Sequence, residues 1–393
     1  MNKWGTHEHV MARLQRLWRS GRLLADRLEA SSVLFSLRIP LKHPTAAELS
    51  TQFDAARDWI AALREASARH GYALKWKTIR HRQLGENRLP VAAIVETPEA
   101  ALAMLRKQAE ADRFDAIAGS IRERFPELLD WLSRKPLKAL EHADDWPRLL
   151  DIIDWLRAHP RPGCYLRQID LPGVHTKFIE KRRGLLSELL DIVLPENAID
   201  HDATRVRHFE PRYGFRAKPK RIRFRLLDPR QFIEGLDDLS VPLESFRKLA
   251  PPARRIFITE NDINGLAFPH QRDSLVVFGL GYGLDTLRDI PWLSDREIHY
   301  WGDIDTHGFA MLDQLRRHYP EAHSLLMDEA TLRQHRALWG SEPHPIQHDL
   351  PRLRGAEQDL YDALREDRFA PRLRLEQERI GYRHLEQALM RLE

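Results

Sequence analysis

Apolar spacings typical of helices and of strands alternate along the first part of the chain. Residues 3–30 carry apolar positions near helical spacing and predict a charged helix. A second helix is expected to follow Thr45, a good N-cap residue, and to end at Gly71, a good C-cap residue. Alternating apolar residues predict short strands at Ser31–Pro40, and at Tyr72–Arg82 and Leu89–Glu96 around a turn at residues 85–87.

Residues 98–158 predict a run of helical pieces, because Pro126, Pro136 and Pro147 interrupt the apolar spacing. A segment rich in Pro and Gly, residues 160–173, is expected to be a linker or a wing. The next helix, ended by Pro195, carries four apolar residues on or near one face, namely Phe178, Leu185, Leu189 and Ile192. A basic helix beside a basic strand pair is typical of a winged-helix DNA-binding module. A solvated helix flank would give the same pattern.

The pattern changes after residue 250. Short, continuously apolar segments bounded by loops predict buried strands at Arg254–Glu260, Ser274–Leu280 and Glu297–Ile304, with a fourth at Ala322–Met327. Helical stretches lie between and after them, at Gly283–Arg288 and at Gly308–Tyr319, before Pro320. Strands that alternate with helices predict a parallel α/β sheet.

Composition agrees with a multidomain globular protein. The chain has 393 residues, of which 42% are hydrophobic, so it can fill large cores and form two or three domains. We expect an α+β N-terminal arm for partner binding at residues 1–160, a winged-helix module at 161–245 and a catalytic α/β domain at 246–393. A disordered or collagen-like chain is excluded.

Cysteine usage and the chain start suggest a cytoplasmic location. The single cysteine, Cys164, cannot form an internal disulfide and is expected to be a small buried apolar residue. The start is charged and lacks the apolar core of a secretory signal. The longest uncharged stretch of the middle region, Ser274–Leu284, is too short to span a bilayer. We therefore expect a soluble protein with no membrane partner.

Positive charge is concentrated near the middle of the chain. Residues 201–230 hold ten Lys and Arg against three acidic residues, whereas the whole chain carries only +4. Alternation places Arg221, Arg223 and Arg225 on one strand face, which suits contact with a phosphate backbone. A solvated basic face paired to acids is the alternative. The predicted DNA-binding residues are Arg216, Lys218, Lys220, Arg221, Arg223 and Arg225, together with Lys177, Lys181 and Arg182 of the preceding helix.

Carboxylates stand at the ends of two predicted strands. Glu260 ends the first strand, and Asp303 and Asp305 end the third. Ligands of open α/β sheets bind outside the carboxyl ends of the strands, so these residues converge if the two strands are neighbours. Three hard oxygen donors suit Mg²⁺. An Asp-x-Asp after a strand is also an ordinary turn or helix cap.

Two polar residues beside these carboxylates are candidates for supporting roles. Asn261 would orient Glu260 or a water, although a turn residue needs no function. His307 would contact a phosphate or a metal, although a histidine at a helix start is more often structural.

The order strand–Glu, then strand–Asp-x-Asp, resembles the Toprim domain of type II and type VI topoisomerases, primases and OLD-family nucleases. Longer segments resemble the D subunits of Wadjet anti-plasmid defence systems: FITENDINGLAFP, VVFGLGYGLDTL, WGDIDTHGFAMLDQLRRHYP and RLEQERI. The stretch HTKFIEKRRGLLSELLD resembles the amino-terminal part of the same subunits more loosely. The resemblance covers nearly the whole chain, and its specific part is the back half.

This resemblance implies a CAP-like winged-helix module followed by a Toprim domain, as in the A subunit of topoisomerase VI. It implies a metal-dependent endonuclease that cuts closed-circular plasmid duplex DNA. Its partners would be an SMC-type ATPase complex with kleisin-type subunits and a second copy of the chain. Glu260, Asp303 and Asp305 match the Toprim acids, and Glu376 or Glu378 would reach a second ion. The implied cofactor is Mg²⁺ or Mn²⁺, as two ions. For Glu376 and Glu378, an exposed charged helix with paired side chains is the alternative.

The chain departs from topoisomerase VI in one respect. None of its tyrosines lies in an Arg-x-x-Tyr-Tyr context, so hydrolysis by a metal-activated water is favoured over a phosphotyrosine intermediate. Tyr165 and Tyr213 remain the alternative nucleophiles. A P-loop motif is absent from the sequence, so ATP hydrolysis would belong to a partner. A topoisomerase-like strand-cleaving subunit and a non-catalytic DNA-binding adaptor remain the alternative functions.

Overall fold

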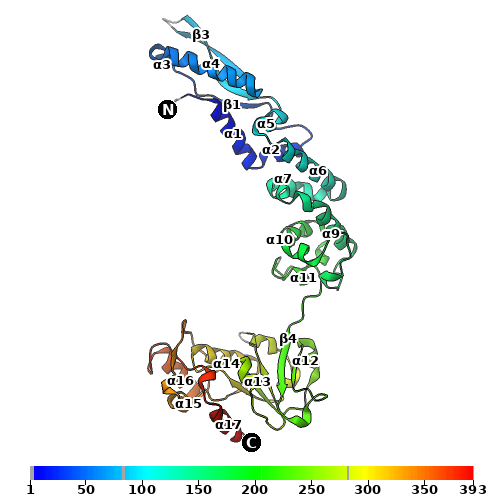
Figure 1. Ribbon diagram of the computed structural model, residues 1–393, viewed down its shortest axis with the longest axis vertical. Helices are drawn as coiled ribbons and strands as arrows, with labels where there is room; N and C mark the ends of the chain where they lie inside the picture. The colour runs from blue at the N-terminus through cyan, green and yellow to red at the C-terminus, as the bar shows by residue number, and fades with distance from the viewer. Residues whose placement is uncertain (1–3, 82–84, 205, 281–282, 393) are drawn as a thin grey trace. The chain divides into compact units, whose positions relative to one another are not determined.

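The computed structural model describes residues 4–81, 85–204, 206–280 and 283–392. It divides into two compact units, Met1–Ala217 and Lys218–Glu393 (Figure 1). Each unit contains its own clusters of buried apolar side chains. The expected domain boundaries at residues 161 and 246 therefore lie inside these units rather than between them.

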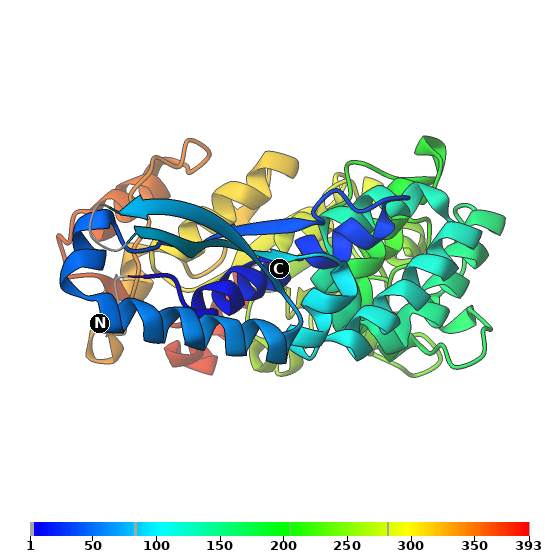
Figure 2. The ribbon, with the colours of Figure 1, turned by 90° about the horizontal axis from the view of Figure 1, so that it is seen from above.

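The first unit begins with a three-stranded antiparallel sheet in the order β1-β3-β2, formed by β1 (Leu37–Pro40), β2 (Ala73–His81) and β3 (Gly85–Val95). Helix α4 (Phe53–His70) runs beside the β2–β3 hairpin (Figure 2). Thr45 caps the short helix α3 (Ala46–Thr51) by accepting from the Glu48 N–H, and Gly71 ends α4 at a φ of 76°. Both expected caps are confirmed, but the single helix expected between them is divided at Gln52 into α3 and α4. Residues 85–87, which the pattern assigns to a turn, are the start of β3.

The rest of the first unit is helical, as expected. Its segments begin or nearly begin at Pro98, Pro126, Pro136 and Pro147, because a proline in the first turn loses no helical hydrogen bond. The helices of this unit are α1 (His7–Arg19), α2 (Arg22–Ala25), α5 (Pro98–Leu105), α6 (Gln108–Arg124), α7 (Leu129–Arg134), α8 (Pro136–Glu141), α9 (Trp146–Ala158), α10 (Thr176–Val193) and α11 (Phe209–Arg212). Among the described residues, no helix is both long enough and apolar enough to traverse a bilayer.

Helix α10 is the predicted basic helix, capped at its start by His175. Phe178, Leu185 and Leu189 of the predicted apolar face are buried, whereas Ile192 near the end of the helix is 38% exposed. The Pro- and Gly-rich segment 160–173 is not an extended linker, because Leu166 and Ile169 within it are buried in the helical core.

The second unit is built on a six-stranded sheet in the order β5-β4-β7-β6-β8-β9. The strands are β4 (Arg221–Leu226), β5 (Asp238–Pro242), β6 (Arg255–Thr259), β7 (Ser274–Phe278), β8 (Glu297–Trp301) and β9 (His323–Ser324). Strands β7, β6, β8 and β9 run parallel, and β4 and β5 are antiparallel additions at one side. The predicted parallel α/β sheet is confirmed, with a shorter fourth strand.

Helices and a small two-stranded antiparallel sheet complete the second unit. The helices are α12 (Leu243–Leu249), α13 (Asp262–Leu266), α14 (Thr306–His318), α15 (Glu329–Gln334), α16 (Gly355–Arg365) and α17 (Tyr382–Met390). Strand β10 (Gly340–Ser341) pairs antiparallel with β11 (Leu373–Arg374), and an isolated bridge joins Ile304 to Leu375. These contacts bring the C-terminal segment against the end of β8.

The basic strand pair assigned to the winged-helix module is part of this C-terminal sheet. Strand β4 pairs with β7, and its apolar residues Ile222, Phe224 and Leu226 are fully buried in the core of the second unit. Helix α10 and β4 therefore belong to different units. The assignment of β4 to a winged-helix module is therefore wrong. The strand pairs with β7 and buries its apolar face in the core of the second unit.

Two glycine substitutions should separate helix propensity from packing. Gly184→Ala in α10 is expected to stabilise the protein by about 0.5–1 kcal/mol, because nothing lies within 4 Å of the added Cβ. Gly265→Ala is expected to destabilise it by about 1–3 kcal/mol, because its Cβ would lie 2.2 Å from Cγ of Phe278. Urea unfolding measures both. Equal effects would contradict the packing around Gly265.

Candidate functional site

Two neighbouring parallel strands set the position of the predicted acids. Strands β6 and β8 pair in parallel with Thr259 opposite Trp301, so Glu260 emerges beside Gly302 and just before Asp303. A Cβ added to Gly302 would lie 2.8 Å from Oε1 of Glu260, which shows how closely the two strand ends approach. Glu260, Asp303 and Asp305 line one cavity of about 240 Å³. The expected convergence of these three residues is therefore found.

Each aspartate is held through one oxygen by a backbone N–H group. Asp303 Oδ1 accepts from the Gln377 N–H at 2.8 Å, and Asp305 Oδ1 accepts from the Gly308 N–H at 2.8 Å as the N-cap of α14. A Cβ on Gly308 would lie 2.1 Å from the Asp303 carbonyl oxygen, so this turn requires glycine. Asp305 is thus a helix cap, as the alternative interpretation holds, and it also faces the cavity.

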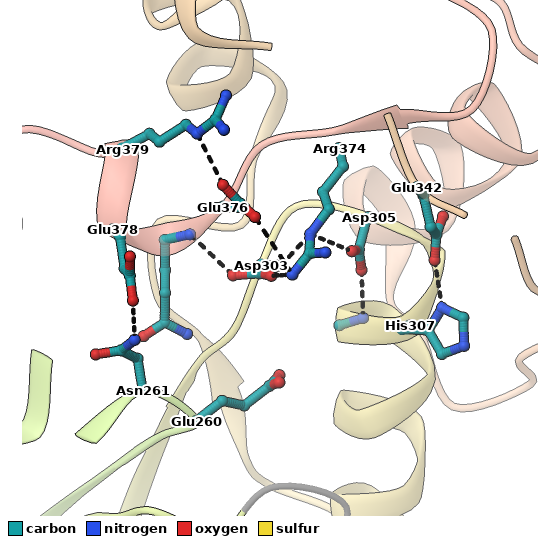
Figure 3. Close-up of polar contacts among 12 residues, drawn as sticks. Glu260, Asn261, Asp303, Asp305, His307, Glu342, Arg374, Glu376, Glu378 and Arg379 are labelled. Atoms are coloured by element: carbon teal, nitrogen blue, oxygen red, sulfur yellow. Dashed lines mark hydrogen bonds and ion pairs between the residues drawn. The ribbon is translucent and has the colours of Figure 1, made fainter. Parts of the chain in front are cut away.

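The remaining oxygens of the pair converge on Arg374. Its Nη2 and Nε lie 2.6 and 3.1 Å from Asp303 Oδ2, and its Nε lies 3.2 Å from Asp305 Oδ2 (Figure 3). Strand β11 and the bridge between Ile304 and Leu375 place the guanidinium there. A cation from the C-terminal segment therefore offsets part of the negative charge of the Asp-x-Asp pair.

Burial disturbs the protonation of the acids. It raises the pKa of Glu260, although the hydroxyl of Tyr300 donates to Oε1 and opposes this shift. Burial, and after it the negative charge of Glu342, raise the pKa of Asp305 to about 7. The pKa of buried Tyr300 is raised well above its usual value by burial and by Glu260, so this hydroxyl stays a donor. Burial thus raises the pKa of both Glu260 and Asp305, which favours the protonated form of these two carboxyls.

The supporting candidates occupy the rim with partners of their own. Glu376 lies 2.8 Å from Nε of Arg379 and 3.8 Å from Nη2 of Arg374, whereas Glu378 is exposed and accepts from Asn261 (Figure 3). Asn261 also caps α13 by accepting from the Asn264 N–H at 2.9 Å. It therefore contacts Glu378 rather than orienting Glu260.

His307 lines the cavity and contacts the buried carboxylate of Glu342. Glu342 also accepts from the Thr306 hydroxyl, with 2.8 Å to each oxygen. The start of α14 is thus joined to the β10 segment by a buried acid.

The carboxylate donors of this cavity suit a divalent cation by their chemistry, but their present positions do not form a complete metal site. The donors are hard carboxylate oxygens, which suit Mg²⁺ or Mn²⁺, and the two Oδ2 atoms of the Asp pair already face a single cation. Within the described ranges, however, no group of three or more His, Cys, Asp or Glu side chains is arranged to hold a metal. Arg374 stands where such an ion would bind.

The predicted row of three arginines on β4 has three different environments. Arg225 is buried and bonded to Asp237 at 3.1 Å and to the carbonyls of residues 265, 266 and 268. Arg223 forms a fork with Asp238 at 3.0 and 2.6 Å, and exposed Arg221 contacts Ser240. Two of the three guanidiniums are therefore occupied by acids, which does not support phosphate contact by Arg225.

The other predicted basic residues are mostly exposed. Arg216, Lys218 and Lys220 are exposed on the segment that connects the two units, and Lys177 and Lys181 are exposed on α10. Arg182 is partly buried and lies 2.6 Å from Asp145. The alternative tyrosine nucleophiles also differ, because Tyr213 is fully buried and donates to Asp191 at 2.8 Å, whereas Tyr165 is 43% exposed.

Several residues of this site are missed by the sequence patterns, namely Tyr300, Glu342, Arg374 and Gln377. Arg374 and Gln377 lie in the C-terminal segment RLEQERI, where the two glutamates draw attention. The bridge between Ile304 and Leu375, beside the β10–β11 pair, brings that segment to the end of β8. Tyr300 lies on β8 three residues before Asp303, and its hydroxyl is the signal that could have found it. Glu342 carries no local signal, since its role comes from the approach of β10 to α14.

Comparison with known protein families gives two matches. The family described as "Wadjet protein JetD, C-terminal" matches residues 214–389. The family described as "Uncharacterized protein conserved in bacteria N-term (DUF3322)" matches residues 7–191. A comparison with curated proteins gives no match.

Asp305→Asn is expected to stabilise the protein at pH 8 in EDTA by about 1–2 kcal/mol. The folded-state pKa of Asp305 is raised to about 7. The contribution of protonated Asp305 to the free energy of unfolding is therefore complete below about pH 4 and is lost as the pH rises through 7. Asn lacks the charge but caps helices as well as Asp does, so the two proteins should converge at pH 4.

Urea unfolding at pH 4, 6 and 8 measures this difference. Asp349→Asn, whose parent side chain is 92% exposed, is the control and should show no such pH dependence. A less stable Asp305→Asn protein at pH 8 would mean that the Arg374 ion pair outweighs the cost of burial.

Proposed function

The chain belongs to the JetD family of Wadjet proteins through its residues 214–389, and from this premise we propose that it is a metal-dependent DNA endonuclease. It would act as the nuclease subunit of a Wadjet defence complex and cut closed-circular plasmid duplex DNA. Residues 246–393 would form a Toprim-like catalytic domain. The observation that carries the proposal is the cavity where Glu260 meets Asp303 and Asp305 at the ends of β6 and β8.

The arrangement of the acids supports phosphodiester hydrolysis. Asp303 and Asp305 would hold a divalent cation through their Oδ2 atoms, since their Oδ1 atoms accept backbone N–H groups. A bound Mg²⁺ or Mn²⁺ would neutralise charge on the scissile phosphate. Glu260 would bind the cation or move a proton, and its pKa, which burial raises, supports the second role. Glu376 or Glu378 would serve a second ion at the rim.

The tyrosines argue against a topoisomerase-like mechanism. Tyr213 lies in the core of the first unit, where it cannot reach DNA without unfolding. Tyr165 is exposed, but it belongs to the first unit and does not line the cavity of Glu260, Asp303 and Asp305. Hydrolysis by an activated water is therefore the mechanism we propose.

A non-catalytic DNA-binding adaptor is the second candidate function. The ion pairs of Arg374 with Asp303 and Asp305 favour it, because they satisfy both carboxylates without a metal. In that case the acids would only stabilise the fold.

We also propose the partners that the family suggests. The helical first unit would bind an SMC-type ATPase complex with kleisin-type subunits, since the chain itself has no P-loop. A homodimer would allow paired subunits to cut both strands. A cytoplasmic location fits these partners.

Cleavage of supercoiled plasmid by the purified protein tests the proposal. With Mg²⁺ or Mn²⁺, alone or with its SMC-type partner complex, we expect nicked or linear DNA with no protein attached to the ends. Glu260→Gln and Asp303→Asn should each lower the rate at least about 100-fold, because each removes a charge from the site. Agarose gels with and without protease treatment measure both properties.

Glu321→Gln, whose parent side chain is 91% exposed, is the matched control and should cleave normally. Cleavage that survives Glu260→Gln and Asp303→Asn would reject this catalytic site. An inactive protein, even with its partner complex, would instead favour the adaptor.

Phosphate contact by the connecting segment has its own test. Lys218→Ala/Lys220→Ala should weaken binding to a linear duplex and reduce the slope of log K against log salt by about 0.9 for each lost phosphate contact. Fluorescence anisotropy at several salt concentrations measures this slope. Lys75→Ala/Lys77→Ala, two exposed lysines with the same spacing on β2, is the control. An unchanged slope would remove this segment from the DNA-binding surface.

A further inference from the structure

The guanidinium of Arg374 already occupies the space between Asp303 and Asp305. Each aspartate fixes its Oδ1 on a backbone N–H, so neither carboxylate can rotate without losing that bond. Both Oδ2 atoms are left for the same guanidinium, at 2.6 Å for Asp303 and 3.2 Å for Asp305 (Figure 3). Whatever cation binds this pair must take the place of Arg374.

The cavity carries too little positive charge for its acids. Four carboxylates line it, those of Glu260, Asp303, Asp305 and Glu342, and the only Lys or Arg in this lining of described residues is Arg374. Such a site attracts a further cation.

The guanidinium is held, but not in the geometry that binds carboxylates best. Both of its contacts to Asp303 go to one oxygen, rather than forming the parallel fork of a bidentate pair. The side chain of Arg374 is 33% exposed, and Glu376 offers a second acceptor 3.8 Å from Nη2 on the open side. The guanidinium can therefore leave the aspartates without losing every acidic partner.

We propose that Arg374 and a divalent cation exclude each other at the two Oδ2 atoms, and that the displaced guanidinium becomes the positioning residue for a DNA phosphate. This inference rests on the proposed function and adds a regulatory step to it. Without metal, Arg374 is neutralised by the aspartates and unavailable to DNA. With metal, it turns toward Glu376 and faces the incoming phosphate.

Metal binding and DNA binding are then coupled through one side chain. Because linkage is reciprocal, metal raises the affinity for DNA by the same factor by which DNA raises the affinity for metal. The protein would hold its metal tightly only when a phosphate backbone is present to accept the released guanidinium.

The first experiment measures metal affinity without DNA. Isothermal titration of the purified full chain with Mn²⁺ should show tighter binding by Arg374→Met than by the parent protein, by about tenfold, because the competing cation is gone. Arg374→Lys keeps a cation and should stay near the parent value. Arg372→Met, an exposed arginine two residues away, is the matched control and should not change the affinity.

The second experiment measures the coupling. Binding of a short labelled duplex is followed by anisotropy with and without Ca²⁺ or Mn²⁺, and the ratio of the two affinities is the readout. The parent protein should show a ratio well above one, whereas Arg374→Met should bring it close to one. A purely structural Arg374 would leave this ratio unchanged.

Each outcome decides a separate question. Equal metal affinity in the parent and Arg374→Met proteins would overturn this inference and leave the nuclease proposal intact. Absence of metal binding in every variant would overturn both. Tighter metal binding by Arg374→Met in a protein that never cleaves DNA would support the exclusion and reject the nuclease. If Arg374→Met fails to fold, as judged by circular dichroism, Arg374→Gln replaces it, since the amide still donates to the carboxylates.

Discussion

The candidate site depends on the parallel pairing of β6 with β8. This register sets Thr259 opposite Trp301, so the residue after each strand meets its counterpart at one edge of the sheet. A shift by one residue would turn Glu260 to the opposite face and separate it from the aspartates. Gly302 is part of the same constraint, because a side chain there would collide with Glu260 and Tyr300.

The acids that gather at one edge of the sheet repel one another, and the C-terminal segment reduces this repulsion. The strand β11 returns to the end of β8 and inserts Arg374 between Asp303 and Asp305. The same segment supplies the Gln377 N–H to Asp303 and the Gln377 side chain to Thr259. One short stretch of chain therefore offsets part of the charge of the aspartates and holds Asp303 in place, which links the metal-free stability of the unit to the residues of its site.

Sequence patterns predicted well whatever depends on neighbouring residues along the chain. Helix caps at Thr45 and Gly71, breaks at prolines and the apolar strands β6, β7 and β8 were all recognisable, because each is set by local backbone preference or by continuous burial. The sequence placed Glu260 and the aspartates at strand ends, and their convergence depended on β6 and β8 being neighbours, which the order of the sheet shows. The errors arose where distant segments decide, as with β4, whose basic face suggested a DNA-binding wing although its apolar face completes a distant sheet.

The sequence by itself determined the parallel α/β sheet, the acids at its strand ends and the likeness to Wadjet D subunits, since all three reside in contiguous segments. Only the tertiary structure decided which charges meet. Arg225 and Arg223 look equivalent to Arg221 along the strand, yet Asp237 and Asp238 occupy them and leave Arg221 exposed. Arg374 is 69 residues from Asp305 along the chain, and no local pattern links them. Coulomb interactions depend on the distance between charges in space, and these charges approach one another only after the six-stranded sheet and the β10–β11 pair have formed.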